Sequence, residues 1–345
     1  MFFRQSILLA LAFSASGCSG GLLNLGLPRT PGEVSAAYGY VPLDPLPVDT
    51  SYCRFGTKIY SSGADGRPAA SKNPLRALPD QTIRFAVASF DQTKGSLTFG
   101  PTQLTLRGGQ YRAVLDYINS DSIPFDVYIR ARVAKIDEKG ELQTGSRFVP
   151  LGEQLNKRIH RIVGYEAIAS DTNNTVSRLL ADSGVIEESD ISNKRLYAFT
   201  EEKEKFKEYT LVTIPIYVGI GLRLSADVLS LQGGATLSGL GVIGAEAEAN
   251  RVTGTLTVQS LGVSGKSIAS ALPLPSKLDR TTIENSILAI GTMRASLYQD
   301  DDSSDKIERN ARLVGLFSPV GSDALLINAV YTELARTRPK WITPC

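Results

Sequence analysis

The sequence predicts a β-rich α+β fold, in which an antiparallel sheet or sandwich carries a long Gly-rich hairpin and two or three amphipathic helices. Three observations lead to this prediction. Several segments alternate apolar and polar residues, glycine is frequent (31 of 345 residues), and three segments have apolar residues at helical spacing. Alternation with a period of two places one set of side chains in a core and the other in solvent, as in an antiparallel strand.

A first β domain is expected at residues 81–150, because turn signals there separate several alternating segments. A linker at Ser120–Pro124 is expected to divide the last two strands. The predicted strands are residues 82–90, 97–106, 111–117 and 125–133.

A long hairpin is expected at residues 211–263, inside a mixed α+β domain at 151–345. Two alternating arms flank a middle rich in glycine and alanine, which is also compatible with a short helix. Packing inside a sheet is the first interpretation. The alternatives are an exposed surface for a partner and insertion into a bilayer, since both arms reach the roughly 9–11 residues that a transmembrane strand needs.

Helices are expected where apolar residues share one stripe, with Gly184 ending the first and a Thr281/Glu284 capping box starting the second. A strand is expected at residues 313–317. The charged run at 201–208 is expected to be a solvated face. The predicted helices are residues 176–184, 281–298 and 322–336.

Residues 1–17 have the pattern of a secretory signal: one charge at Arg4, a short apolar run and small residues before Cys18. The apolar run is too short to cross roughly 30 Å of hydrocarbon as a helix. The exit sequence Ala-Ser-Gly-Cys resembles the lipobox of bacterial lipoproteins. The resemblance covers only the first eighteen residues and implies cleavage before Cys18, acylation of that cysteine and, with Ser19 next to it, an outer-membrane location.

Residues 18–80 contain many prolines and glycines, which predicts an extended tether and loop that hold the folded part away from the bilayer. Two further cysteines, Cys53 and Cys345, form an even pair. In an oxidising compartment such a pair predicts a disulfide, although two unpaired thiols are the alternative.

Metal and cofactor sites are not expected. His160 is the single histidine, and there is no Cys-x-x-Cys spacing, so a His/Cys metal centre lacks ligands. A weak calcium candidate lacks the glycine and distal glutamate of an EF-hand, so a solvated loop is the first interpretation. Its carboxylates are Asp300, Asp301, Asp302 and Asp305.

The remaining motifs argue against several function classes. Gly262–Ser267 ends like a P-loop, but Ser260 stands where the first glycine is needed, so a turn is expected. No Gly-x-Ser-x-Gly motif supports a Ser-His-Asp hydrolase. With 37 basic and 35 acidic residues, the chain is a poor candidate for binding nucleic acid.

The expected function is that of a non-catalytic, membrane-anchored envelope lipoprotein with a structural, assembly or partner-binding role. Its partners would be other envelope proteins or further copies of itself. One alternative is a pore-forming or outer-membrane-inserting subunit that uses residues 211–263. Another is a hydrolase of envelope polymers that uses two carboxylates.

Overall fold

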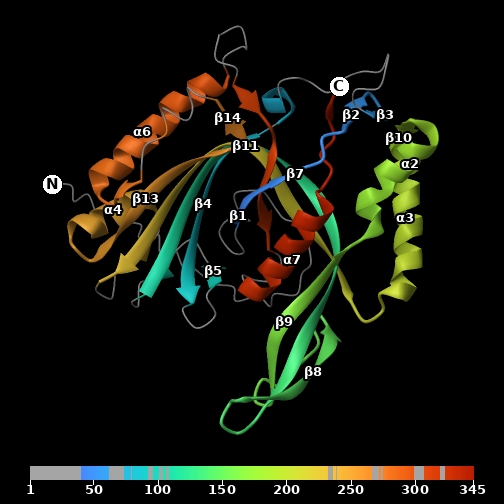
Figure 1. The fold of residues 1–345 in the computed structure, drawn as a ribbon, viewed down its shortest axis with the longest axis horizontal. Coiled ribbons are helices and arrows are strands. Elements are labelled where there is room, and N and C mark those ends of the chain that lie inside the picture. Colours follow the sequence, from blue (N-terminus) through green and yellow to red (C-terminus); the bar gives the residue numbers. More distant parts are fainter. Residues whose placement is uncertain are drawn as a thin grey trace, which may run out of the picture.

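A computed structural model describes residues 40–61, 74–78, 80–91, 96–100, 104–105, 109–231, 236–237, 239–265, 272, 275–298, 307–318 and 323–345. The predicted β-rich α+β class is confirmed, with ten described strands in one antiparallel sheet (Figure 1). Helices pack against this sheet, and a smaller four-stranded sheet lies at its side.

Two long strands, β7 (Gly109–Ile136) and β11 (Thr210–Ser230), form the centre of the large sheet. They pair without interruption along all 21 residues of β11, from Thr210 opposite Ile129 to Ser230 opposite Gly109. The linker predicted at Ser120–Pro124 is therefore wrong, because β7 runs straight through it.

Pro124 does not break β7, because the N–H that proline lacks would point away from β11 at this position. The N–H of Asp126 donates to Asn173 Oδ1 (3.2 Å) and its carbonyl accepts from the Ser170 N–H (2.9 Å), so both point away from β11. Residues two apart in a strand point their backbone groups the same way, so Pro124, opposite Pro215, costs no hydrogen bond to β11.

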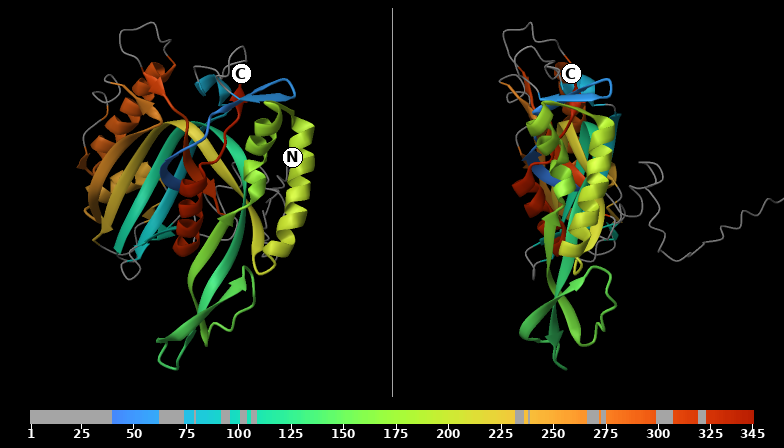
Figure 2. Two further views of the ribbon diagram at one scale, coloured as in Figure 1. Left: turned by 45° about the vertical axis from the view of Figure 1, so that its right-hand side comes forward. Right: turned by 90° about the vertical axis from the view of Figure 1, so that its right-hand side faces the viewer.

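Each central strand changes its outer partner midway along its length. The first half of β7 pairs with β4 (Asp80–Asp91), which pairs with β5 (Ser96–Gly100). The second half of β7 pairs on one edge with β9 (His160–Ala169) and, at its end, on the other edge with β8 (Leu142–Pro150). These three strand segments form an arm that projects from the body (Figures 1 and 2).

The outer edge of β11 pairs first with β17 (Arg312–Phe317) and then with β13 (Val252–Leu261). The predicted hairpin at 211–263 is thus β11 and β13, and its middle contains the helix α4 (Leu240–Glu248). Both arms of the hairpin lie inside the sheet.

The predicted domain boundaries differ from the structure in two places. The tether predicted at residues 18–80 is too long, because β1 (Tyr40–Pro47) pairs with β17 in the large sheet and buries Tyr40 and Val41. The division at residue 150 does not hold either, because β7 and β11 come from the two predicted domains and share one ladder.

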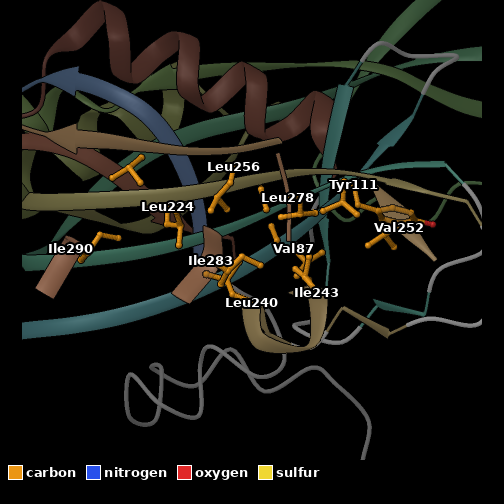
Figure 3. Packing of buried hydrophobic residues seen from close by; sticks show 14 of the residues in the cluster. Val87, Tyr111, Leu224, Leu240, Ile243, Val252, Leu256, Leu278, Ile283 and Ile290 are labelled. Carbon is orange, nitrogen blue, oxygen red and sulfur yellow. The ribbon is translucent and has the colours of Figure 1, made fainter. Parts of the chain in front are cut away.

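The main core lies between the sheet and the helices α4 and α6 (Arg280–Leu297). Figure 3 shows Leu224 of β11 facing Leu240 and Ile283 of the two helices, with Val87 and Ile243 beside them. The other end of the sheet is covered by α7 (Ala324–Thr337), whose buried side chains Leu326, Val330 and Leu334 belong to the cluster around Phe125 and Ile216.

The helix ends agree partly with the sequence patterns. Gly184 ends α2 (Thr175–Ser183) in the left-handed region at φ 70°, as predicted. The cap of α6 is Asp279 and not Thr281: the Asp279 carboxylate accepts from the Thr282 N–H (2.7 Å), and the Thr282 hydroxyl accepts from the Asp279 N–H (3.1 Å).

The remaining elements are short, except for α3 (Glu188–Lys205), which the sequence did not predict. The four-stranded sheet consists of β10 (Val185–Glu187), β3 (Lys58–Ser61), β2 (Tyr52–Phe55) and β18 (Thr343–Pro344). The others are η1 (Pro74–Ala77), β6 (Leu104–Thr105), η2 (Asp171–Asn174), β12 (Thr236–Leu237), β14 (Val263–Ser264), β15 (Ser276–Lys277) and β16 (Glu308–Arg309).

Candidate interaction surfaces

The projecting arm has a small core of its own. Ala131, Val133 and Val149 are buried together, with Leu155 and Ile162 packed against them. Along β8 every side chain except that of Val149 is exposed. The outer edge of β8 has no partner strand among the described residues, so the arm presents both backbone and side chains to its surroundings.

Arg130 fixes the base of the arm to the body. Its guanidinium forms ion pairs with Glu166 (2.7 Å) and Glu208 (3.2 Å) and stacks over the rings of Phe148 (4.0 Å) and Tyr209 (4.4 Å). A planar guanidinium is suited to both kinds of contact at once. The arm is therefore held at its base by packing as well as by the strand ladder.

A buried polar network joins the base of the arm to η2 and α3. The Asp126 carboxylate accepts from the hydroxyls of Thr213 (2.6 Å) and Thr172 (3.1 Å). The Glu202 carboxylate accepts from the Ser170 hydroxyl (2.5 Å) and the Asp171 N–H (2.6 Å). Both carboxylates are buried but satisfied, as a stable interior requires.

Tyr128 lies beside this network and stacks on Phe206 with ring centroids 4.5 Å apart. Burial raises the pKa of Tyr128 to about 12, and the nearby carboxylates of Glu202 and Asp126 act in the same direction. The phenol therefore stays protonated at neutral pH and ties α3 to β7 as a neutral group. The expectation that residues 201–208 are all solvated is wrong at Glu202.

A cleft of about 540 Å³ opens between α2 and α3. Leu179 and Ile186 contribute apolar surface, while Asp190 and Lys194 carry charges of both signs. Tyr197 also lines the cleft and is 60% exposed. Such a mixture of apolar surface and a few polar groups is typical of sites that take a ligand or a partner side chain. The remaining lining residues are Asp182, Ser183, Val185 and Asn193.

A second buried charge cluster lies within the sheet, where the sequence pattern predicted a solvated face. Asp116 is 0% exposed and forms a bidentate pair with Arg223 on the adjacent strand (2.6 and 2.7 Å). Arg223 also donates to the carbonyl of Leu43 (2.7 Å), and the Tyr40 hydroxyl donates to Asp116. These bonds connect β1 to β7 and β11, so the cluster has a structural role.

The structure joins Cys53 and Cys345 by a disulfide, with Cα atoms 4.9 Å apart. The two cysteines lie on neighbouring strands, because β18 pairs in parallel with β2 and the Cys345 N–H donates to the Arg54 carbonyl (2.9 Å). The last residue of the chain is thereby tied to one of its first described strands.

Among the other predicted site residues, Cys18 and the calcium candidate, Asp300, Asp301, Asp302 and Asp305, lie outside the described residues. His160 begins β9 on the arm, and its buried Nδ1 has no hydrogen-bond partner within the described part of the chain. Gly262 makes the expected turn at φ 71°, between β13 and β14.

The described part of the chain contains no group of three or more His, Cys, Asp or Glu side chains placed to hold a metal ion. None of its helices combines the length and the apolar composition needed to cross a bilayer.

Comparison of the chain with protein-family models, with curated proteins and with solved structures gave no match. The interaction surfaces must therefore be interpreted from their own geometry and chemistry.

Proposed function

We propose that this chain is a lipid-anchored protein of the bacterial envelope that acts as a non-catalytic binding or assembly component. The observation that supports this proposal best is the projecting arm: nearly all of β8 is exposed, and its outer edge has no partner strand among the described residues. The lipobox-like sequence at Cys18 supports the anchor. The bond between Cys53 and Cys345 supports an oxidising compartment, because structural disulfides persist there and are rare in the cytosol.

The buried carboxylates favour binding over hydrolysis of a polymer. Asp116 is neutralised by Arg223, while Glu202 and Asp126 are occupied by hydroxyl and backbone donors. A glycosidase needs two carboxyl groups that face the scissile bond from opposite sides. These three groups face the interior and serve the packing of strands and helices.

The position of β11 favours the binding role over a pore made by residues 211–263. Ile216, Ile220 and Leu224 are fully buried, and β11 pairs with β7 along its entire length. Release of this hairpin into a bilayer would break the centre of the large sheet. The anchor would instead leave the folded part intact beside the membrane.

The anchor is tested by metabolic labelling with a clickable palmitate analogue. We expect label on the wild-type protein and none on Cys18→Ser. The double variant Cys53→Ala with Cys345→Ala, which keeps Cys18 as its single cysteine, should retain the label and serves as the control. Absence of label on the wild-type protein would refute the anchor and leave the envelope location without its main support.

Partner binding is tested at the cleft between α2 and α3. A photo-crosslinking amino acid in place of Tyr197 is expected to give a discrete heavier product in intact cells. The same amino acid at Leu288, which is 67% exposed on α6, serves as the control. Equal products at both positions, or none at Tyr197, would argue against the cleft as the contact surface.

A further inference from the structure

The far end of the arm carries an unusual row of apolar side chains. Leu142 of β8 lies opposite Ile136 of β7, and the Ile136 N–H donates to the carbonyl of Ile159 (3.0 Å) on the other side. Leu142 is 54% exposed and Ile159 is 48% exposed. Three large aliphatic residues thus lie on adjacent backbone segments at the end of β7 that is farthest from the body. Figure 2 shows this end of the arm.

Five basic residues flank these three aliphatic residues in the sequence, and none of the five forms an ion pair with another described residue. All are exposed. Of the acidic residues nearby, Asp137 is engaged by the backbone N–H groups of Lys139 (2.9 Å) and Glu141 (2.8 Å). These bonds do not remove its charge, so Asp137, Glu138 and Glu141 are the three opposing charges beside five basic residues. The basic residues are Lys135, Lys139, Lys157, Arg158 and Arg161.

We propose that this tip, Ile136, Leu142 and Ile159 with the five basic residues around them, contacts the surface of a bilayer that contains anionic lipids. The apolar row would enter the boundary between headgroups and acyl chains, and the basic residues would lie against lipid phosphates. The inference rests on the envelope location proposed above and adds a second membrane contact to the one made by Cys18.

The size and chemistry of the tip favour a membrane over a protein partner. Two paired strands and the turn before β9, at spacings of about 4.8 Å, make a tip roughly 10 Å wide. A stable protein interface needs about 800 Å² on each partner, which a surface of this width does not offer. Insertion of a few aliphatic side chains with phosphate contacts at their rim needs much less area.

The arm is also built to hold its tip at a fixed position. β7 continues from the body into the arm as one strand, and Arg130 clamps the base through Glu166 and Phe148. The tip would therefore meet a flat surface without rearrangement of the arm, while α3 stays away from it.

The test uses the complete mature protein in vesicles of phosphatidylcholine with or without phosphatidylglycerol. An environment-sensitive fluorophore is attached at Leu142→Cys, and in a second protein at Leu196→Cys, which is 71% exposed on α3. The native disulfide leaves the new thiol free for labelling. The parent protein, treated in the same way, reports whether Cys18 is free, so a failed anchor is distinguished from a failed tip contact.

We expect the emission of the probe at position 142 to shift to shorter wavelength and to be quenched by brominated lipid, in both cases only in the anionic vesicles. The emission of the probe at position 196 should not change. Reversal of three tip charges, Lys157→Glu with Arg158→Glu and Arg161→Glu, should shift the equilibrium toward the free tip by about 100-fold or more, at roughly five-fold per charge. Reversal of Lys203, Lys205 and Lys207 near the end of α3 is the matched control and should have little effect.

Three outcomes would overturn the inference: no quenching at Leu142 in anionic vesicles, equal quenching at Leu142 and Leu196, or equal losses from the two triple variants. Equal quenching at the two positions would show that the molecule lies on the vesicle surface without a specific contact at the tip. Equal losses from the two triple variants would show that net charge alone attracts the protein to the membrane.

Discussion

Removal of the disulfide by Cys53→Ala with Cys345→Ala is expected to lower the free energy of unfolding by several kcal/mol. The bond joins two residues that are 292 positions apart in the sequence. The chain-entropy relation for a loop of this length gives about 5.7 kcal/mol at 25 °C. That is a large part of the roughly 5–15 kcal/mol by which a folded domain is stable.

Most of this effect should arise in the unfolded chain, because the folded ends have other contacts. β18 remains paired with β2, and Trp341 donates from its indole to Asp121 (3.0 Å). Alanine is the appropriate replacement at position 53, since that side chain is fully buried and a hydroxyl there would need a partner.

The assay is unfolding in urea followed by two signals. Trp341 is the single tryptophan, is buried, and reports on the carboxyl end, while far-ultraviolet circular dichroism reports on the large sheet. With a slope near 3 kcal/mol/M, the midpoint should fall by roughly 2 M while the two signals remain coincident. Wild-type protein unfolded and refolded in reductant should behave like the variant.

A loss of less than about 1 kcal/mol would refute this reasoning, because it would mean that the bond hardly restricts the unfolded chain. Separation of the two signals would instead show that the carboxyl end unfolds locally before the sheet.

Three further predictions concern single side chains. Arg223→Leu should cost about 3–5 kcal/mol in urea unfolding, because it leaves Asp116 buried without its counter-charge, whereas the double variant with Asp116→Leu should recover part of that loss. Stability should fall as the pH rises from about 10 to 12, because tyrosines whose pKa is raised in the folded protein, such as Tyr128, Tyr40 and Tyr165, ionise first in the unfolded chain, where their pKa is about 10. Tyr128 accounts for one part of this slope. Tyr128→Phe should flatten this dependence in thermal melts, and an unchanged slope would contradict the role given to this residue. Asp279→Ala should lower stability by about 1 kcal/mol through loss of the α6 cap, whereas Thr281→Ala should change it little.

Several strands and three of the helices were accessible from the sequence because burial of one face leaves a periodic pattern, whereas β1, β8 and β9 were not predicted. The alternation in β11 and the helical spacing in α2, α6 and α7 are direct consequences of that burial. α3 was missed because it is mostly solvated, and Ile191 and Glu202 are its only two buried residues. Its pattern of charges therefore predicts exposure and not a helix.

The interaction surfaces were harder to predict, since they depend on contacts between distant segments. Asp116 and Arg223 are 107 residues apart and meet only through the register of β7 with β11. Pro124 suggests a linker until its orientation relative to β11 is known. The tip of the arm likewise becomes visible only when Leu142 and Ile136 are placed on neighbouring strands and Ile159 beside them in the turn before β9.

The continuity of β7 has a mechanical consequence. At about 3.3 Å per residue, its 28 residues amount to a contour of roughly 90 Å, which passes from the edge of the helix-covered core to the far end of the arm. A pull or push applied at Ile136 would travel along one covalent strand, which pairs with β8 and β9 in the arm and with β11 and β4 in the body. Load at the arm would thus be shared by the whole sheet, and the distance between arm tip and core would stay constant under it.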